Sequence, residues 1–202
     1  MKAGGRIYIF SGPSGVGKST IIRKLRERVE GLGYSVSHTS RRPRSDEVDG
    51  VDYHFVDRDT FIRMVKEKAF VEWALVYDEY KGTSFSSLHA QMDRGEDVVL
   101  DVDGRGAGNI KKQFKESVLI YILPPSLEVI ERRLRARAAE DETEMDTRIR
   151  QVREELRDCT WYDYLIINSD LEKALKDAES VILADRCRKD RVLPEIKEMF
   201  GI

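Results

Sequence analysis

A lysine and a hydroxyl side chain follow a run of glycines near the amino terminus, in the pattern G-x-x-x-x-G-K-S. In such a loop, glycines let backbone N–H groups converge on phosphate oxygens at the start of a helix, whose positive end faces the anion. We expect Lys18 to reach the β- and γ-phosphates of a nucleotide, Ser19 to place its hydroxyl on Mg²⁺, and Thr20 to continue into the helix. The loop consists of Gly12, Pro13, Ser14, Gly15, Val16, Gly17, Lys18 and Ser19.

The alternative interpretation of this segment is a glycine-rich turn with an exposed lysine. An apolar run at residues 7–10 directly precedes the loop, and a helical pattern follows it. This order of strand, loop and helix favours a nucleotide-phosphate site. The loop predicts the ligand class and leaves the reaction open.

A second group of polar residues combines arginines with hydroxyl side chains at residues 37–44, and is followed by Asp52-Tyr53 and by Glu72-Trp73. The planar guanidinium of arginine suits recognition of phosphate or carboxylate. Taken alone, basic residues before a proline are more typical of a solvated loop. Beside a phosphate loop, anion binding becomes the stronger hypothesis.

The elements that must position these side chains are short apolar strands and intervening helices. Apolar runs bounded by turn residues predict buried parallel strands at 7–10, 98–102, 118–123 and 165–167. Helical patterns cover 20–30, 85–94, 107–114, 127–138, 144–158 and 171–189, with a last short helix before the terminus. Alternating strands and helices predict a doubly wound α/β fold.

Two stretches depart from that rhythm and are candidates for moving parts. Residues 37–90 are polar and aromatic, with short strands predicted at 53–56 and 70–73 and a helix at 58–68. Residues 127–158 carry only narrow apolar stripes on otherwise charged helices. A narrow stripe buries little surface, which permits motion.

Composition limits the remaining possibilities. The 202 residues suffice for one good-sized core, and 35 basic against 37 acidic side chains give a net charge of -2, which argues against a nucleic-acid coat. The two cysteines, Cys159 and Cys187, have no paired spacing and suggest reduced thiols. The sequence has no apolar signal segment and no run of membrane-spanning length, so we expect a soluble cytoplasmic protein without membrane or nucleic-acid partners. Oligomeric state is left open.

Together these motifs resemble those of guanylate kinases, P-loop nucleoside monophosphate kinases that move the γ-phosphoryl group of ATP onto GMP. The resemblance covers nearly the whole chain, in the family's order and at close to its spacings. The matching segments are SGPSGVGKS from residue 11, SVSHTSRRPR from 35, GVDYHFV from 50, FVEWA from 70, KGTS from 81, LDVD from 100, ILPPS from 122 and IINSD from 166.

The resemblance implies a P-loop NTPase-type doubly wound parallel sheet in a single domain, 1–202. Its core would be 1–36, 91–126 and 159–202, with a small mixed GMP-binding insertion at 37–90 and a helical lid at 127–158. The substrates would be ATP with Mg²⁺, and GMP or dGMP. Guanine offers donors at N1 and N2 and an acceptor at O6, so its pocket needs facing acceptors and a donor. The residues matching the family's GMP positions are Ser37, Arg41, Arg44, Tyr53, Glu72, Lys81, Thr83 and Asp103.

The remaining matches concern catalysis and the donor nucleotide. Arg133 and Arg137, four residues apart on one helix face, and Arg148 on the next helix match the family's lid arginines, which with Lys18 and Arg41 would be the catalytic residues. Asp101 would orient Mg²⁺ or its waters, and Asn168 resembles the asparagine on the adenine side. The alternatives are a surface helix with alternating charges for the arginines, and a cap of the following turn for Asp101.

Three departures from the family pattern accompany the resemblance. Lys81 stands where a tyrosine usually helps hold the GMP phosphate, so either Lys81 replaces it as a point charge or Lys81 points to solvent and Tyr80 swings in. Arg105 replaces a usual glutamine and could pair with an acid or face solvent. Ala138 replaces the glycine usual after the lid arginine, which would stiffen a hinge.

Two competing functions follow from the same residues. A P-loop kinase could take dGMP or another monophosphate as acceptor, since Lys81 and Arg105 alter that side. A guanylate-kinase-like module could instead grip a protein ligand without catalysis; such modules typically lack an intact phosphate loop. Because the loop is complete here, the kinase is the favoured interpretation.

Overall fold

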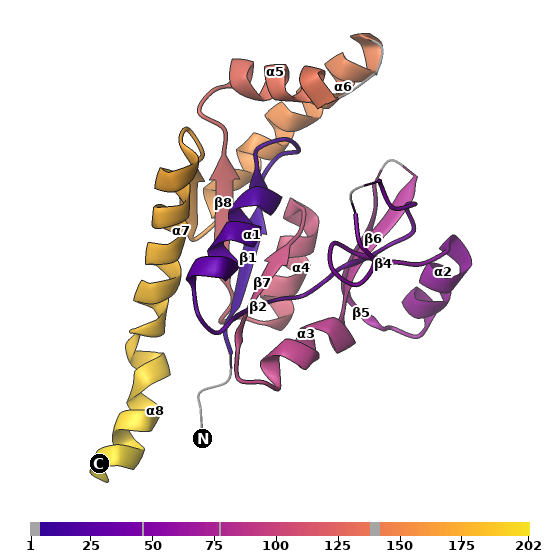
Figure 1. Ribbon diagram of the computed structural model, residues 1–202. Helices are drawn as coiled ribbons and strands as arrows, with labels where there is room; N and C mark the ends of the chain where they lie inside the picture. The colour runs from indigo at the N-terminus through magenta and orange to yellow at the C-terminus, as the bar shows by residue number, and fades with distance from the viewer. Residues whose placement is uncertain (1–4, 46, 77, 138–141) are drawn as a thin grey trace.

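Five parallel strands form the central sheet of the protein, in the order β2-β7-β1-β8-β9 (Figure 1). The computed structural model describes residues 5–45, 47–76, 78–137 and 142–202. The chain adds β2 and β7 on one side of β1 and β8 and β9 on the other, so the direction of strand addition reverses at β1. In open α/β sheets a ligand crevice forms at such a point, outside the carboxyl ends of the strands. The strands are β1 (Ile7–Ser11), β2 (Leu32–Tyr34), β7 (Asp97–Asp101), β8 (Val118–Leu123) and β9 (Tyr164–Ile167).

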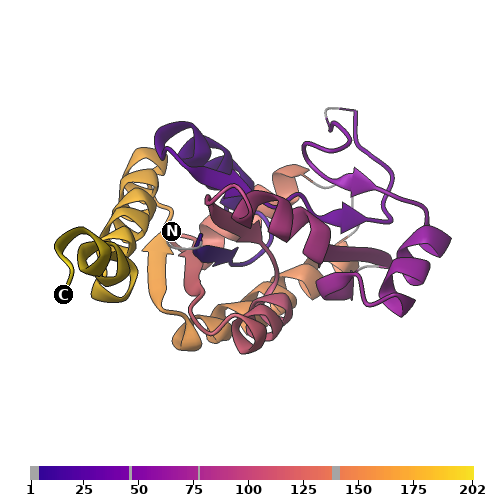
Figure 2. The same cartoon turned by 90° about the horizontal axis from the view of Figure 1, so that it is seen from below.

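Helices cover both faces of this sheet (Figure 2). Alternate side chains of β1 enter different cores: Tyr8 and Phe10 pack with α1 and α7, whereas Ile7 and Ile9 pack with α3 and α4. A strand buried on both faces needs apolar residues at every position, which explains the uninterrupted apolar run. The predicted α/β fold with a parallel core is confirmed. The helices are α1 (Lys18–Arg28), α3 (Phe85–Met92), α4 (Gly104–Gln113) and α7 (Leu171–Arg186).

A second, four-stranded sheet stands beside the core (Figure 1). Its order is β4-β3-β6-β5, and it is mixed: β3 and β4 are parallel, whereas β6 runs antiparallel to both β3 and β5. Phe61 of α2 is fully buried and stacks on Phe70 and Tyr80, with ring centroids 4.4 and 5.2 Å apart. This small aromatic core holds the sheet together. The elements are β3 (His38–Thr39), β4 (His54–Phe55), α2 (Arg58–Lys66), β5 (Phe70–Val76) and β6 (Glu79–Ser84).

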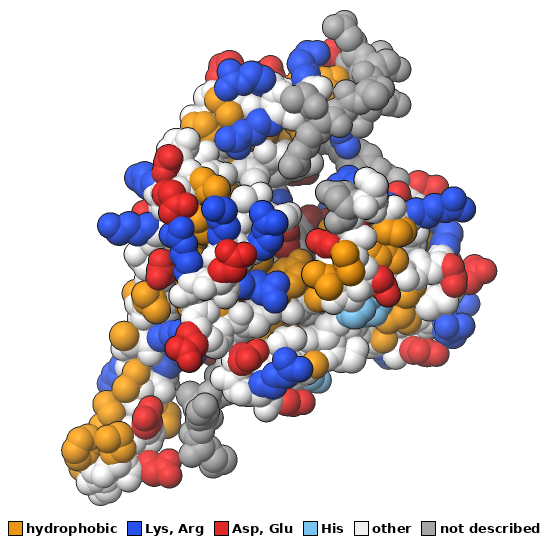
Figure 3. All heavy atoms as spheres, in the orientation of Figure 1, with side chains coloured by type: hydrophobic (Ala, Val, Ile, Leu, Met, Phe, Trp, Pro, Cys, Tyr) orange, Lys and Arg blue, Asp and Glu red, His pale blue; other side chains and the backbone are white. Residues whose placement is uncertain are grey.

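Two helices, α5 (Leu127–Arg137) and α6 (Glu142–Glu155), lie above the ends of β1 and β8 (Figure 1). Each buries a narrow stripe, and the stripes join the core cluster that contains α1 and α7. In the space-filling view the surface is hollowed between these helices and the lobe of the second sheet (Figure 3). The buried residues of the stripes are Ile130, Leu134, Met145 and Val152.

The carboxyl-terminal region has the predicted strand and helices but differs from expectation in burial and bounds. The strand predicted at 165–167 is confirmed as β9, which pairs in parallel with β8. The expectation that this strand is buried is wrong, because β9 is an edge strand on which Leu165 and Ile167 are each 51% exposed. The helix predicted at 171–189 is confirmed as α7, which ends at Arg186, and the last short helix expected before the terminus is α8 (Lys189–Phe200), which has 12 residues. Arg191 of α8 binds Asp97 and Asp185, with N–O distances of 2.8 and 3.2 Å, and so anchors this helix to the core.

Several elements were not predicted from the sequence, because they are short or polar. These are β2, β3 and β6 and the 3₁₀ helix η1 (Leu156–Trp161). Helix α4 begins at Gly104 and not at Ala107, since the Asp103 side chain accepts a hydrogen bond from Gly106 N and caps it. Within the described ranges of the chain, no helix is long and apolar enough to cross a membrane.

Candidate active site

Backbone geometry shapes the phosphate loop between β1 and α1. Gly12 and Gly17 have φ angles of 140° and 100°, a region that side chains rarely adopt. A Cβ atom on Gly12 would lie 2.4 Å from the carbonyl oxygen of Ile122, so only glycine fits there. Gly17 caps α1 without a side-chain hydrogen bond, which leaves the first N–H groups of the helix for a ligand.

The end of β7 brings an acid beside this loop. Phe10 of β1 is in register with Asp101 of β7, so the Asp101 carboxylate lies next to the first turn of α1. Lys18 Nζ lies 4.0 Å from Asp101 Oδ1 and donates to the Gly12 carbonyl at 2.6 Å. Ser19 Oγ donates to Asp101 Oδ2 at 3.5 Å. Burial raises the pKa of Asp101, whereas the Lys18 ammonium opposes that rise.

The far side of the loop is held through a single carbonyl, that of Val16. Asn168 Nδ2, which is buried, donates to it at 2.8 Å, and Arg133 Nη1 donates to it at 3.3 Å. Leu134 of the same helix approaches Gly15, where an added Cβ would lie 3.3 Å from Leu134 Cδ2. Asn168 therefore supports the loop through a hydrogen bond, and α5 packs directly against the loop.

A buried carboxylate marks the second sheet where it faces the core. Glu72 on β5 is 8% exposed, and its Oε1 accepts hydrogen bonds from Thr83 N at 2.9 Å and Thr83 Oγ1 at 2.8 Å. Ser37 Oγ lies 3.4 Å from Thr83 Oγ1. The structure thus brings together two hydroxyls and one acid that are far apart in the sequence.

Asp103 completes this group from the core side. A Cβ atom on Gly106 would lie 2.9 Å from Glu72 Oε2 and 3.2 Å from Asp103 Oδ1, so both carboxylates converge on the absent side chain of Gly106. Burial raises the pKa of Glu72 to about 7, and the Asp103 charge adds to the rise while the Thr83 hydrogen bonds oppose it. Arg105, one residue away, is exposed.

Arg41 is fixed by an acid that the sequence analysis did not single out. Its Nη2 donates to both oxygens of Glu47, at 2.6 and 2.8 Å, and its Nη1 donates to the Arg42 carbonyl at 2.7 Å. Arg44 is 73% exposed, and its Nη1 lies 3.9 Å from Glu47. The signal for Glu47 is weak, because an acid six residues after an arginine has no periodic meaning in a loop.

Lys81 lies over the ring of Tyr53, with Nζ 5.6 Å from the ring centroid, and Arg41 lies at the same centroid distance. Burial lowers the pKa of Lys81 and the Arg41 charge lowers it further, while burial raises the pKa of Tyr53 to about 12. Tyr80 instead stacks on Phe61, since neighbouring residues of β6 face opposite sides of the sheet. The lysine, and not Tyr80, faces Tyr53.

The predicted lid arginines occupy α5 and α6. Arg133 touches the phosphate loop, as described above, and Arg148 is half-buried on α6. Arg137 is the last residue of α5, and its side chain lies outside the described part of the structure, as does Ala138. Arg153 of α6 pairs with Glu131 of α5 at 3.6 Å, which ties the two helices together.

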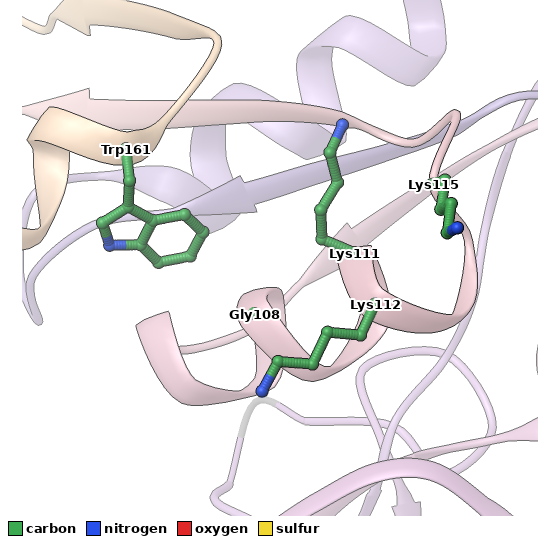
Figure 4. A pocket seen from close by; sticks show the side chains of 5 residues that line it. All are labelled: Gly108, Lys111, Lys112, Lys115 and Trp161. Atoms are coloured by element: carbon green, nitrogen blue, oxygen red, sulfur yellow. The ribbon is translucent and has the colours of Figure 1, made fainter.

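A cavity of about 490 Å³ lies away from these residues, between α4 and Trp161 (Figure 4). Lys111, Lys112 and Lys115 line it, but their ammonium groups point in three different directions. Lys111 pairs with Asp163 at 3.5 Å. Cations that diverge do not form an anion site, so this cavity gives no second candidate.

Comparison with known proteins agrees with the arrangement of these residues. The family model described as guanylate kinase matches residues 4–185. The guanylate kinase of Carboxydothermus hydrogenoformans is 44% identical over 188 residues, which cover 93% of this chain and 92% of that protein. The guanylate kinase of Syntrophotalea carbinolica is 41% identical over 202 residues, covering 100% of this chain and 96% of that one.

Solved structures give the same result. The crystal structure of guanylate kinase from Anaplasma phagocytophilum superposes with a TM-score of 0.82 at 30% identity, and the match covers 99% of this chain and 97% of the other. Both the fold and the length therefore correspond. The chain belongs to the guanylate kinase family.

Proposed function

We propose that this protein transfers the γ-phosphoryl group of ATP to the phosphate of GMP, giving ADP and GDP. The observation that carries the choice of acceptor is the buried Glu72 carboxylate, converging with Asp103 beside the hydroxyls of Ser37 and Thr83. Carboxylates accept the N1 and N2 protons of guanine, whereas adenine presents an unprotonated N1. An unpaired buried carboxylate is heavily penalised, so AMP is rejected.

Four side chains make up the acceptor clamp, the name used here for the residues that would hold the GMP phosphate. Arg41 and Lys81 flank the Tyr53 ring, and their charges lie on one side of the second sheet. The raised pKa of Tyr53 keeps its phenol protonated and able to donate a hydrogen bond. Exposed Arg44 would close over the phosphate from solvent. The clamp therefore consists of Arg41, Arg44, Tyr53 and Lys81.

The donor side suits ATP with Mg²⁺. Ser19 and Asp101 present oxygen ligands to one point beside the loop, a hydroxyl and a carboxylate, which is the donor set of a magnesium ion that keeps phosphates and waters as its other ligands. Mg²⁺ bound there neutralises charge on the phosphates. Lys18 would leave the Gly12 carbonyl for the β- and γ-phosphates, and Asn168 would keep the loop in shape through Val16.

In the transfer itself, the bond between the γ-phosphorus and the oxygen that bridges the β- and γ-phosphates breaks, and a bond between the γ-phosphorus and a phosphate oxygen of GMP forms. The protein contributes alignment and charge stabilisation rather than covalent chemistry. Arg133 already contacts the loop, and Arg137 and Arg148 would join it when helices α5 and α6 close over the triphosphate. Closure also excludes water that would otherwise hydrolyse ATP.

A coupled assay with ATP and a panel of GMP, dGMP, AMP, CMP and UMP tests the proposal. We expect GMP to have the highest kcat/KM, with AMP, CMP and UMP lower by orders of magnitude. Preference for dGMP or another monophosphate would assign a shifted acceptor. No turnover with any acceptor would contradict the proposal and favour a binding module.

A further inference from the structure

Glu47 joins the two arginines of the acceptor clamp, and neither the motif nor the substrate requires it to do so. Its carboxylate accepts two hydrogen bonds from Arg41 Nη2, at 2.6 and 2.8 Å, and one from Arg44 N at 2.8 Å. Glu47 N in turn donates to the Arg44 carbonyl at 3.2 Å. The side chain therefore closes a turn with Arg44 and orients Arg41 with the same two oxygens.

Contacts fix the Arg41 guanidinium on its edges and on its faces. Besides Glu47, the edges face the Arg42 carbonyl at 2.7 Å and Glu79, with Nε to Oε2 at 3.9 Å. The faces lie over Tyr53 and Phe55, at 5.6 and 5.8 Å from the ring centroids. Both partners are largely buried, Arg41 at 14% and Glu47 at 12% exposure, so water screens the pair less than a surface pair.

Such fixing matters because a free arginine loses rotamer freedom when it binds a phosphate. Immobilising one long side chain on binding weakens affinity by roughly two- to tenfold. Arg41 bears that cost on folding, through Glu47, and not when the ligand binds. The charge on Glu47 is essential to the contact, and the Arg41 hydrogen bond lowers the pKa of this carboxyl, so it is ionised at neutral pH.

We propose that Glu47 is a positioning residue for the acceptor phosphate, which holds Arg41 in its binding orientation before GMP arrives. This inference rests on the proposed function, in which Arg41 binds the GMP phosphate. Glu47 need not touch the nucleotide. Its role is to lower the KM for GMP through Arg41.

The test is Glu47→Gln, which keeps the size and the acceptor for Arg44 N but removes the charge. We expect the KM for GMP to rise about three- to tenfold, while kcat and the KM for ATP stay within about twofold. The matched control is Asp49→Asn, which removes a charge from the same loop at a side chain that accepts from Phe55 N at 2.8 Å. The control should leave all three constants unchanged.

Three results would overturn the inference. An unchanged KM for GMP in Glu47→Gln would show that Arg41 needs no help, and a lower KM would show that Glu47 competes with the phosphate for Arg41. A kcat loss with equal changes in both KM values would indicate general damage, which also contradicts a positioning role. Glu47→Asp provides a second check, because restoring the charge should recover part of the KM loss.

Arg41→Ala separates failure of this inference from failure of the proposed function. If Arg41 binds the phosphate, Arg41→Ala raises the KM for GMP, and adding Glu47→Gln raises it no further, because the two residues act as one unit. Additive effects in the double variant would refute action through Arg41. An unchanged KM in Arg41→Ala would refute the assignment of Arg41 itself.

Discussion

The phosphate loop and the acceptor clamp both hold phosphate groups, and they do so with different parts of the chain. The loop presents backbone N–H groups at the start of α1, shaped by glycines and enclosed by strands that are buried on both faces. The clamp presents side chains from the loop after β3, from the approach to β4 and from β6 of a small sheet. The backbone fold determines the geometry of the phosphate loop, whereas side-chain orientation determines the geometry of the acceptor clamp.

This difference has a consequence for how each site is supported. Backbone donors cannot rotate like side chains, and the loop is supported through its Val16 carbonyl, which accepts hydrogen bonds from Asn168 and Arg133. Long side chains have many rotamers, so the clamp needs partners such as Glu47 for Arg41 and Tyr53 for Lys81. Substitutions should therefore affect kcat or the KM for ATP at the loop, and the KM for GMP at the clamp.

The largest effect is expected at the loop, with Lys18→Met. Removing the Lys18 ammonium, which would bind the β- and γ-phosphates, should lower kcat by about 10²- to 10³-fold, because its charge acts on the group that transfers. Steady-state kinetics with saturating GMP measures this, and Arg23→Met on an exposed position of α1 is the control. A change confined to the KM for GMP would break the contrast between the two sites.

The next effect is expected at Glu72, with Glu72→Gln. Replacing an acceptor oxygen by an amide donor leaves a guanine N–H group without its partner, so kcat/KM for GMP should fall about 10- to 100-fold. In the native protein kcat/KM should rise with pH through about 7, since the Glu72 carboxyl must lose its proton to accept from guanine. A flat profile in this range would contradict that role.

Glu72→Gln should lower activity but raise the thermal stability of the protein without ligand. The Glu72 carboxyl has a pKa of 4.5 in the unfolded chain and about 7 in the folded protein. Its protonated form therefore favours the folded state at low pH, and this contribution to stability is lost as pH rises through about 7. Without GMP, Glu72→Gln should therefore raise the Tm at pH 8, at roughly 2–4 °C per kcal/mol for a chain of this size. Thermal melts at pH 5 and 8 give the comparison, and the gain should shrink at pH 5.

A smaller effect is expected at Asn168, with Asn168→Ala. Loss of one hydrogen bond to the Val16 carbonyl should loosen the loop and raise the KM for ATP roughly fivefold, corresponding to about 1 kcal/mol. The KM for GMP should stay unchanged. If it rose equally, the loop and the clamp would be more closely coupled than their separate supports imply.

The smallest effect is expected at Lys81, with Lys81→Met. A half-buried ammonium acting as a point charge should be worth about two- to fivefold in the KM for GMP. Because burial lowers the pKa of Lys81, its contribution should fade as pH rises, at a lower pH than for a free lysine. GMP titrations from neutral to alkaline pH in both proteins test this, and identical profiles would count against Lys81.

Much of the core fold could be predicted from the sequence, because a strand buried on both faces leaves a continuous apolar run. The runs at 7–10 and 118–123 predicted β1 and β8 in this way. The same signal located β9 but was wrong about its burial, since a sequence cannot say that a strand has only one neighbour in the sheet. The two-residue strand β3 carries too little pattern to find, whereas β4 was predicted within the run at 53–56.

What the sequence by itself determined was the donor half: a loop of eight consecutive residues whose chemistry is local and whose glycines mark the backbone shape. Only the tertiary structure decided how the acceptor half is assembled. It brought Glu72 to Asp103 across Gly106, placed Lys81 over Tyr53, and set Glu47 against Arg41. The physical reason is that contacts between distant side chains depend on how strands pair and helices pack, which no short window of sequence contains.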